Sequence, residues 1–246
     1  MWTKRQIRQH EEAAKKLAII KDEVASLFKI KSHKLNEKDC LTFIKAAYKK
    51  HSLVNDNKKE FAITAFSKNT REVHYFPKAK GNVLKPNTLI LLDMWARLNK
   101  KGAPYADATF MFFKGSKVPK EIQTTWRTLI KARNAAIKCI EKGTKKSGMP
   151  RGLDVDRVAH DIIGQAGLGK GIKHTIGHSL GLDSPHGKLP GINWREYSRL
   201  SKNVGYTIEP GIYLENFGLR TEIDFYVTSK NKVIITTPLQ DNIEYV

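Results

Sequence analysis

Four acidic residues lie in segments that otherwise have the apolar composition of buried β-strands. Asp93, for example, directly follows the apolar run 89–92. An unpaired charge in a buried strand is strongly unfavourable unless a partner neutralises it. Any one of these acids could be a turn residue or one end of a salt bridge, but together they require a fold that brings compensating charge to them. The four are Asp93, Asp107, Glu209 and Glu222.

Apolar residues at three- and four-residue steps predict helices, because such residues share one helical face. Asn36 is of a type that favours a helix N-terminus, since its side chain can accept a hydrogen bond from the first turn. The predicted helices are residues 2–28, 36–51, 121–141 and 154–164.

Short apolar segments bounded by turn residues predict β-strands in two groups. In the last long segment, Arg220, Glu222 and Asp224 share one face of the strand and apolar residues the other. Because two helices precede each group of strands, we expect one mixed α and β domain with two related halves. The predicted strands are 61–66, 88–94 and 105–113, then 205–208, 211–214, 219–227 and 232–236.

Composition excludes several classes of protein. No apolar run approaches the roughly 20 residues of a membrane span, and the N-terminus lacks the apolar stretch of a signal peptide. Cys40 and Cys139 are the two cysteines of the 246 residues, too few for a disulfide framework or a four-cysteine zinc site. We therefore expect a cytoplasmic protein with no membrane partner, whose chain starts near Met1.

The net charge of +20 favours nucleic acid or anionic surfaces electrostatically. The lysines are scattered, however, and no tract of five or more consecutive basic residues occurs. A solvated basic surface is the preferred interpretation, and nucleic-acid binding is the alternative.

Two glycine-rich motifs invite other interpretations. The segment 177–181 matches the nucleophile elbow of serine hydrolases, but the histidine that follows Ser179 is His186, too close to come from a later strand end. The segment 164–170 resembles a phosphate-binding loop, but Gly171 stands where a serine or threonine should hold magnesium. Neither motif has the context that its chemistry requires.

The acids and a histidine-rich segment together favour a metal site. His174 and His178 lie four residues apart in this segment. Oxygen-rich sites with one imidazole suit hard or borderline divalent ions, manganese in particular. Two such ions would neutralise carboxylates that otherwise repel one another.

The order of these motifs resembles that of the pita-bread metallopeptidases, which include Xaa-Pro aminopeptidases, prolidases and methionine aminopeptidases. The resemblance covers essentially the whole chain and rests on the segments LLDMW, YADATF, IGHSLG, TIEPGIY and LRTEIDFYV. It implies the α+β pita-bread fold, a curved and mainly antiparallel sheet covered by helices in pseudo-two-fold halves. It also implies a single catalytic domain, 1–246, without the N-terminal domain that proline-specific relatives place over the active site.

The resemblance further implies a ligand set for two divalent ions per chain, with Mn²⁺ preferred and Co²⁺, Zn²⁺ or Fe²⁺ as alternatives. Asp93 and Asp107 are further apart than is usual in the family, and we expect an enlarged hairpin around residues 100–102 to absorb the difference. The implied metal ligands are Asp93, Asp107, His178, Glu209 and Glu222.

The activity implied is hydrolysis of N-terminal peptide bonds, of the Xaa-Pro aminopeptidase or dipeptidase type, by a metal-bridging hydroxide. Arg220 would orient Glu222 or a neighbouring acid. The resemblance also implies that the substrate is a peptide and that the chain can form a homodimer. The alternative is a catalytically weak or inactive pita-bread binding module that binds nucleic acid or a protein partner. The implied catalytic residues are His74, His174, His186 and Glu209.

Overall fold

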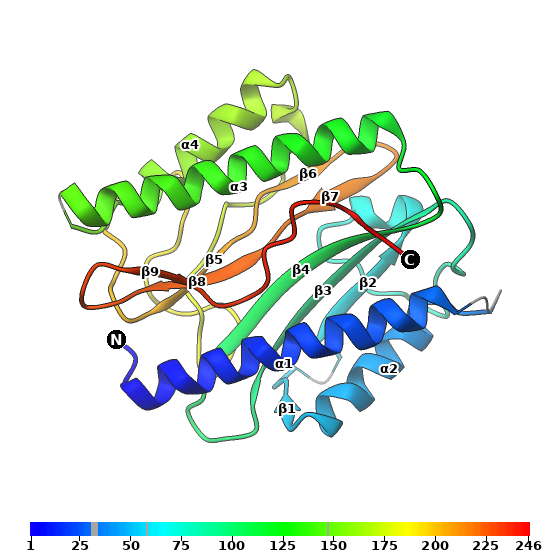
Figure 1. Cartoon of the computed structure of the whole chain (residues 1–246), viewed down its shortest axis with the longest axis horizontal. Coiled ribbons are helices and arrows are strands. Elements are labelled where there is room, and N and C mark those ends of the chain that lie inside the picture. The colour runs from blue at the N-terminus through cyan, green and yellow to red at the C-terminus, as the bar shows by residue number, and fades with distance from the viewer. Residues whose placement is uncertain (31–33, 58, 147) are drawn as a thin grey trace.

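Two pairs of helices flank the strands in the computed structural model, which describes residues 1–30, 34–57, 59–146 and 148–246 (Figure 1). Thr3 and Asn36 begin the first two helices with capping boxes. In each, the N-cap side chain accepts from the backbone N–H of the third helical residue, whose own side chain accepts from the N-cap backbone N–H. The four predicted helices are confirmed, and the third is longer than predicted. One pair is α1 (Lys4–Lys29) and α2 (Glu37–Lys50), and the other is α3 (Lys120–Lys146) and α4 (Gly152–Gln165).

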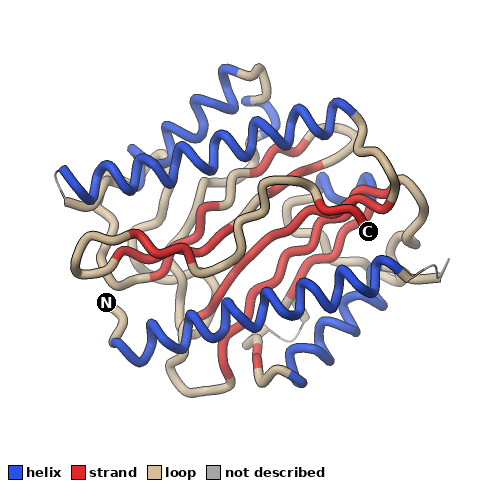
Figure 2. The backbone as a smooth tube through the Cα atoms, viewed as in Figure 1, coloured by secondary structure: helices blue, strands red, loops and turns tan. Residues whose placement is uncertain are grey.

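Two long antiparallel strands, β3 (Thr88–Leu98) and β4 (Tyr105–Lys114), form the centre of the largest sheet. Both β1 (Leu53–Val54) and β2 (Ala62–Phe66) pair with β3, and β10 (Glu244–Tyr245) runs parallel to β4. The strands lie between the two helix pairs (Figure 2). This sheet belongs mainly to the first half of the molecule.

The second half supplies two smaller sheets. The first has the order β5 (Gly205–Ile208), β8 (Ile223–Val227), β9 (Val233–Ile235). The second pairs β6 (Gly211–Tyr213) with β7 (Gly218–Arg220). Short 3₁₀ helices are η1 (Ser67–Arg71) and η2 (Gly169–Gly171).

The prediction of one strand over 219–227 is wrong. The structure has two strands there, interrupted at Thr221 and Glu222, because the pairing partner changes from β6 to β5. The backbone N–H of Thr221 donates to the carbonyl of Pro210 at the interruption. Two very short strands, β1 and β10, were not predicted, since two residues carry no periodic signal.

Alternate residues of β3 enter two different cores. Leu89 and Leu91 belong to the core beneath α3 and α4, whereas Ile90 and Leu92 belong to the core beneath α1 and α2. Both faces of β3 are therefore buried, which explains its continuous apolar run. Asp93 follows on the face of Leu89 and Leu91. Among the described residues, no helix combines the length and apolarity needed to cross a bilayer.

Candidate metal centre

All nine predicted site residues line one cavity of about 710 Å³. They come from β3, β4, the β7–β8 junction and the loops around them, so elements far apart in sequence converge here. The nine are His74, Asp93, Asp107, His174, His178, His186, Glu209, Arg220 and Glu222.

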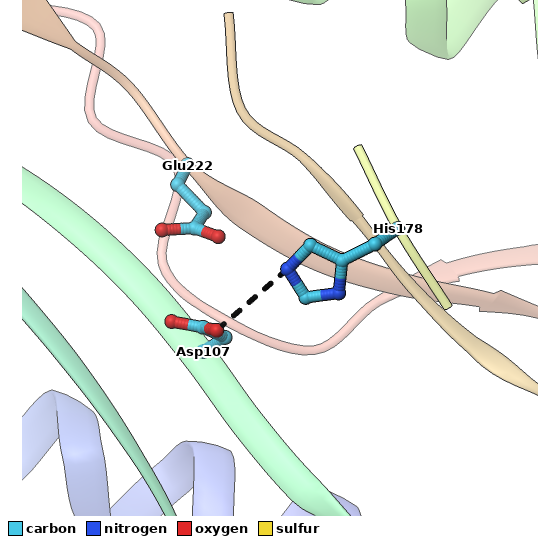
Figure 3. Close-up of side chains that lie close together, drawn as sticks. All are labelled: Asp107, His178 and Glu222. Atoms are coloured by element: carbon cyan, nitrogen blue, oxygen red, sulfur yellow. Dashed lines mark ion pairs between the residues drawn. The ribbon is translucent and has the colours of Figure 1, made fainter. Parts of the chain in front are cut away.

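Within the described part of the chain, three of these residues are close enough together to hold one metal ion. Ligand atoms of Asp107, His178 and Glu222 all lie within 4.8 Å of one another. Figure 3 shows the three side chains pointing toward one another from separate segments. His178 is fixed in place because its backbone N–H donates to Thr207 Oγ1 at 3.0 Å and its carbonyl accepts from Thr207 N–H at 2.9 Å.

Asp93 lies beside this cluster on the neighbouring strand. In the β3–β4 register, Asp93 faces Thr109 and Trp95 faces Asp107, so both acids lie on the same face of the sheet. The turn that joins the two strands, residues 99–104, lies beyond the two acids in this register. Asp93 Oδ2 accepts a hydrogen bond from Arg220, and Asp93 Oδ1 is buried without a hydrogen-bond partner among the described residues.

Glu209 lies between two imidazoles. Its Oε1 is 3.3 Å from His178 Nε2, and its Oε2 is 3.8 Å from His174 Nδ1. His178 Nδ1 donates to the carbonyl of Ser179 at 3.1 Å, which leaves the lone pair of Nε2 directed at the carboxylates. This is the protonation state that a metal-binding histidine requires.

A bound cation would stabilise the buried and mutually repelling carboxylates of this cluster. Burial, together with repulsion from Glu222 and Asp93, raises the pKa of Asp107 well above its ordinary value. Burial and repulsion from Glu209 raise the pKa of Glu222 in the same way. Burial also lowers the pKa of His178 to about 4, so this ring is neutral at physiological pH. An oxygen-rich donor set with one neutral imidazole fits a divalent ion.

Arg220 is the centre of a buried hydrogen-bond network. It donates to Asp93, to Thr109 Oγ1 at 3.0 Å and to Tyr213 Oη at 2.8 Å. The Thr109 hydroxyl then donates to Glu222 Oε2 at 2.7 Å. The predicted contact between Arg220 and the acids is thus present, and Thr109 extends it to Glu222.

Sequence reasoning missed Thr109 and Tyr213 as site residues and noted Asp224 only for its strand face. Asp224 Oδ2 accepts from the backbone N–H of Asp107 at 2.8 Å. Thr109 lies two residues after Asp107 and therefore on the same strand face, a signal that could have found it. No comparable signal identified Tyr213.

The remaining histidines differ in what they offer. His74 and His186 are exposed at the cavity. The ring centroids of His186 and His178 are 4.1 Å apart. His174 is more constrained, because Nδ1 donates to the carbonyl of Thr175 and Nε2 accepts from Tyr213 Oη, each at 2.8 Å. Burial lowers the pKa of His174.

Ser179 lacks the surroundings of a nucleophile. It is buried, and its hydroxyl donates to the carbonyl of Leu189 at 2.9 Å. Within the described ranges, no hydrogen bond joins this hydroxyl to a histidine side chain. The serine-hydrolase interpretation therefore gains no support from the geometry.

Comparison with known sequences gives one family. Residues 8–229 match the model of metallopeptidase family M24. Over 118 residues the chain is 36% identical to "Uncharacterized peptidase SERP1271" of Staphylococcus epidermidis. This alignment covers 48% of this chain and 31% of that protein.

Solved structures show the same fold. The X-Pro aminopeptidase from Thermotoga maritima MSB8 superposes with a TM-score of 0.83 at 24% identity, covering 100% of this chain and 64% of that chain. The Xaa-Pro dipeptidase from Bacillus anthracis gives 0.83 at 21% identity, covering 99% and 63%. These likenesses confirm the predicted pita-bread fold. The chain matches less than two thirds of the length of each relative named here.

Proposed function

The chain belongs to metallopeptidase family M24, and from this premise we propose that it hydrolyses N-terminal peptide bonds as an Xaa-Pro aminopeptidase or dipeptidase. The observation that carries the proposal is the convergence of Asp107, His178 and Glu222 within 4.8 Å at the cavity. Asp93 and Glu209 complete the proposed ligand set of two divalent ions, with Mn²⁺ as the preferred metal. When bound, such ions would lower the pKa of a coordinated water and polarise the carbonyl of the substrate.

Glu209 is the proposed proton carrier. Its two oxygens face His178 and His174, and Glu209 lines the cavity where the water would attack. Oε1 receives the proton of the attacking water, and the carboxyl group then returns it to the leaving amine. His74, exposed at the same cavity, assists that transfer.

Two other groups act on the substrate carbonyl and on the ligands. His186, an exposed donor beside His178, contacts the oxygen on which negative charge develops. We assign His174 to holding Tyr213 rather than to contact with substrate, since both of its ring nitrogens are engaged. Tyr213 and Arg220 in turn keep Asp93 oriented.

Support for the Xaa-Pro preference comes from the fold relatives, which include an X-Pro aminopeptidase and an Xaa-Pro dipeptidase. The proposed partner is a short peptide with a free N-terminus, and the proposed assembly is a homodimer.

The test is a peptidase assay on protein reconstituted with Mn²⁺, using Xaa-Pro, Met-Xaa and generic N-terminal peptides before and after chelation. We expect turnover of Xaa-Pro peptides that chelation abolishes and added Mn²⁺ restores. Turnover that survives chelation, or that prefers Met-Xaa peptides, would refute the proposed mechanism or specificity respectively.

Nucleic-acid binding is the second candidate function, because a surface hollow lined by basic side chains offers a site for the phosphates. A surface hollow of about 880 Å³ beside the N-terminal part of α1 contains four basic side chains. Glu12, also in its lining, forms an ion pair with Lys16 at 3.0 Å. Fluorescence anisotropy with RNA at two salt concentrations tests this function, and we expect Lys100→Ala and Lys101→Ala to weaken binding. The four basic side chains of the hollow are Arg5, Arg8, Lys100 and Lys101.

A further inference from the structure

His74 reaches the cavity on a long connection between β2 and β3. Apart from η1, this connection has no helix or strand of its own. Holding such a loop in one conformation costs conformational entropy, so it needs anchors beyond regular hydrogen-bond ladders. The structure shows two sets of anchors, one supplied by the second half of the chain and one by the start of α2.

The first set of anchors lies in the second half of the chain. The backbone N–H of Gly218 donates to Thr70 Oγ1 at 2.9 Å, and Arg71 donates to the carbonyl of Glu215 at 2.9 Å. Arg220 donates to the carbonyl of Val73 at 3.2 Å. The residue immediately before His74 is thus tied to the metal-site network.

The second anchor is the side chain of Glu37, the first residue of α2, which is 0% exposed. It accepts from the backbone N–H groups of Phe66 and Asn82, each at 2.6 Å. It also accepts from the Tyr75 hydroxyl at 2.7 Å and from Asn69 Nδ2 at 3.0 Å. These donors lie both before and after His74 in the chain. The N-terminus of α2 and charge-assisted hydrogen bonds stabilise the buried carboxylate.

Gly81 is an independent sign that this loop is shaped around the carboxylate. Its φ is +70°, and a Cβ atom there would lie 2.1 Å from Glu37 Oε2. Only glycine fits both the backbone conformation and the space. The loop backbone is therefore packed directly against the Glu37 carboxylate.

We propose that Glu37 is a positioning residue that fixes the loop 67–83 so that His74 faces the catalytic cavity, an assignment that rests on the proposed function. Its effect passes through Tyr75, the neighbour of His74, and through Asn69, which donates to both Glu37 and Tyr75 Oη. Glu37 is absent from the cavity lining, so it acts on neither metal nor substrate directly.

The first experiment compares wild type with Glu37→Gln, Gly81→Ala and Tyr75→Phe. In Glu37→Gln the amide NH₂ would face an N–H or O–H donor, whereas Tyr75→Phe removes a single hydroxyl and leaves the other bonds of Glu37 in place. In the metal-free state, we expect the backbone amides of residues 67–83 to exchange hydrogen faster in these variants than in wild type. In Mn²⁺-loaded Glu37→Gln and Gly81→Ala we expect kcat to fall by about tenfold or more, with KM and bound metal unchanged, and a smaller fall in Tyr75→Phe.

Gly102→Ala is the matched control for Gly81→Ala. Gly102 has the same φ of +70°, but a Cβ there would meet no atom within 4 Å. This variant therefore introduces the same backbone strain without crowding a carboxylate. We expect its kcat and its exchange over 67–83 to match wild type.

A double-mutant cycle with His74→Ala distinguishes positioning from general structural damage. In the His74→Ala background, Glu37→Gln should lower kcat no further, because its effect passes through that imidazole. A fully additive loss, an unchanged kcat in Glu37→Gln, or a fall in kcat explained by lost metal would overturn the proposal. A wild-type protein without metal-dependent peptidase activity would instead refute the proposed function, and the positioning role with it, before any variant is compared.

Discussion

Replacing Asp107 by asparagine removes one charge from a cluster whose ligand atoms lie within 4.8 Å of one another. At that separation, two unit charges repel by about 3 kcal/mol at an effective dielectric constant of about 20. Partial protonation of the carboxylates reduces this value. We therefore expect metal-free Asp107→Asn to be more stable toward unfolding than wild type by about 1 to 3 kcal/mol.

The same substitution should reduce the stabilisation that metal provides. In wild type, each bound Mn²⁺ should add about 2.7 kcal/mol when free Mn²⁺ is one hundred times the dissociation constant of its site. In Asp107→Asn the gain at the same Mn²⁺ concentration should be much smaller. Urea unfolding in chelator and in Mn²⁺ measures both quantities, and the two effects of one substitution have opposite signs.

Asp156→Asn serves as the control for a buried carboxylate outside the site. Asp156 is 1% exposed and bonds His160 Nδ1 at 2.9 Å on α4. This variant should lose stability in chelator and in Mn²⁺ alike, with an unchanged metal increment. The reasoning fails if Asp107→Asn is less stable than wild type in chelator and gains as much from Mn²⁺ as wild type does.

Three further predictions follow from other parts of the structure. Tyr213→Phe removes the hydroxyl that links Arg220 to His174, and steady-state kinetics should show kcat lowered by about ten- to a hundredfold. Ser179→Ala should keep the kcat/KM of wild type in the same assay, and a large loss would revive the serine-hydrolase interpretation. His10 supplies the pH dependence: burial lowers its pKa from 6.5 to about 4. Between these pH values the unfolded chain binds a proton that the folded chain does not, so this residue reduces stability as pH falls from 6.5 to 4, by up to about 3 kcal/mol. Urea unfolding of wild type and His10→Asn across this range should show the pH-dependent difference, and equal pH profiles would contradict it.

The sequence was sufficient to predict the long elements. Helical periodicity in α1 and α2 is unambiguous because each helix buries one face, and Asn36 caps α2 as predicted. The apolar run of β3 predicted a buried strand, and both of its faces enter cores. The convergence of all nine site residues on one cavity agrees with their motif order.

What could not be predicted depends on contacts between distant segments. The interruption of the strand at Glu222 arises from a change of pairing partner, which the β-propensity of the local sequence cannot predict. The hydrogen bond of Arg220 to Thr109 joins two strands that are far apart in sequence, and that of Tyr213 to His174 joins a strand to a distant loop. Glu37 gave no sequence signal of its role because its donors come from four separate positions between Phe66 and Asn82.

The most direct measurement is the metal content of the purified chain. Protein reconstituted with Mn²⁺ and desalted should retain close to two divalent ions per chain by elemental analysis. Glu222→Gln, which alters a residue of the tight cluster, should retain clearly fewer at the same protein concentration. Retention of no ion by wild type, or of equal amounts by wild type and Glu222→Gln, would contradict the metal centre.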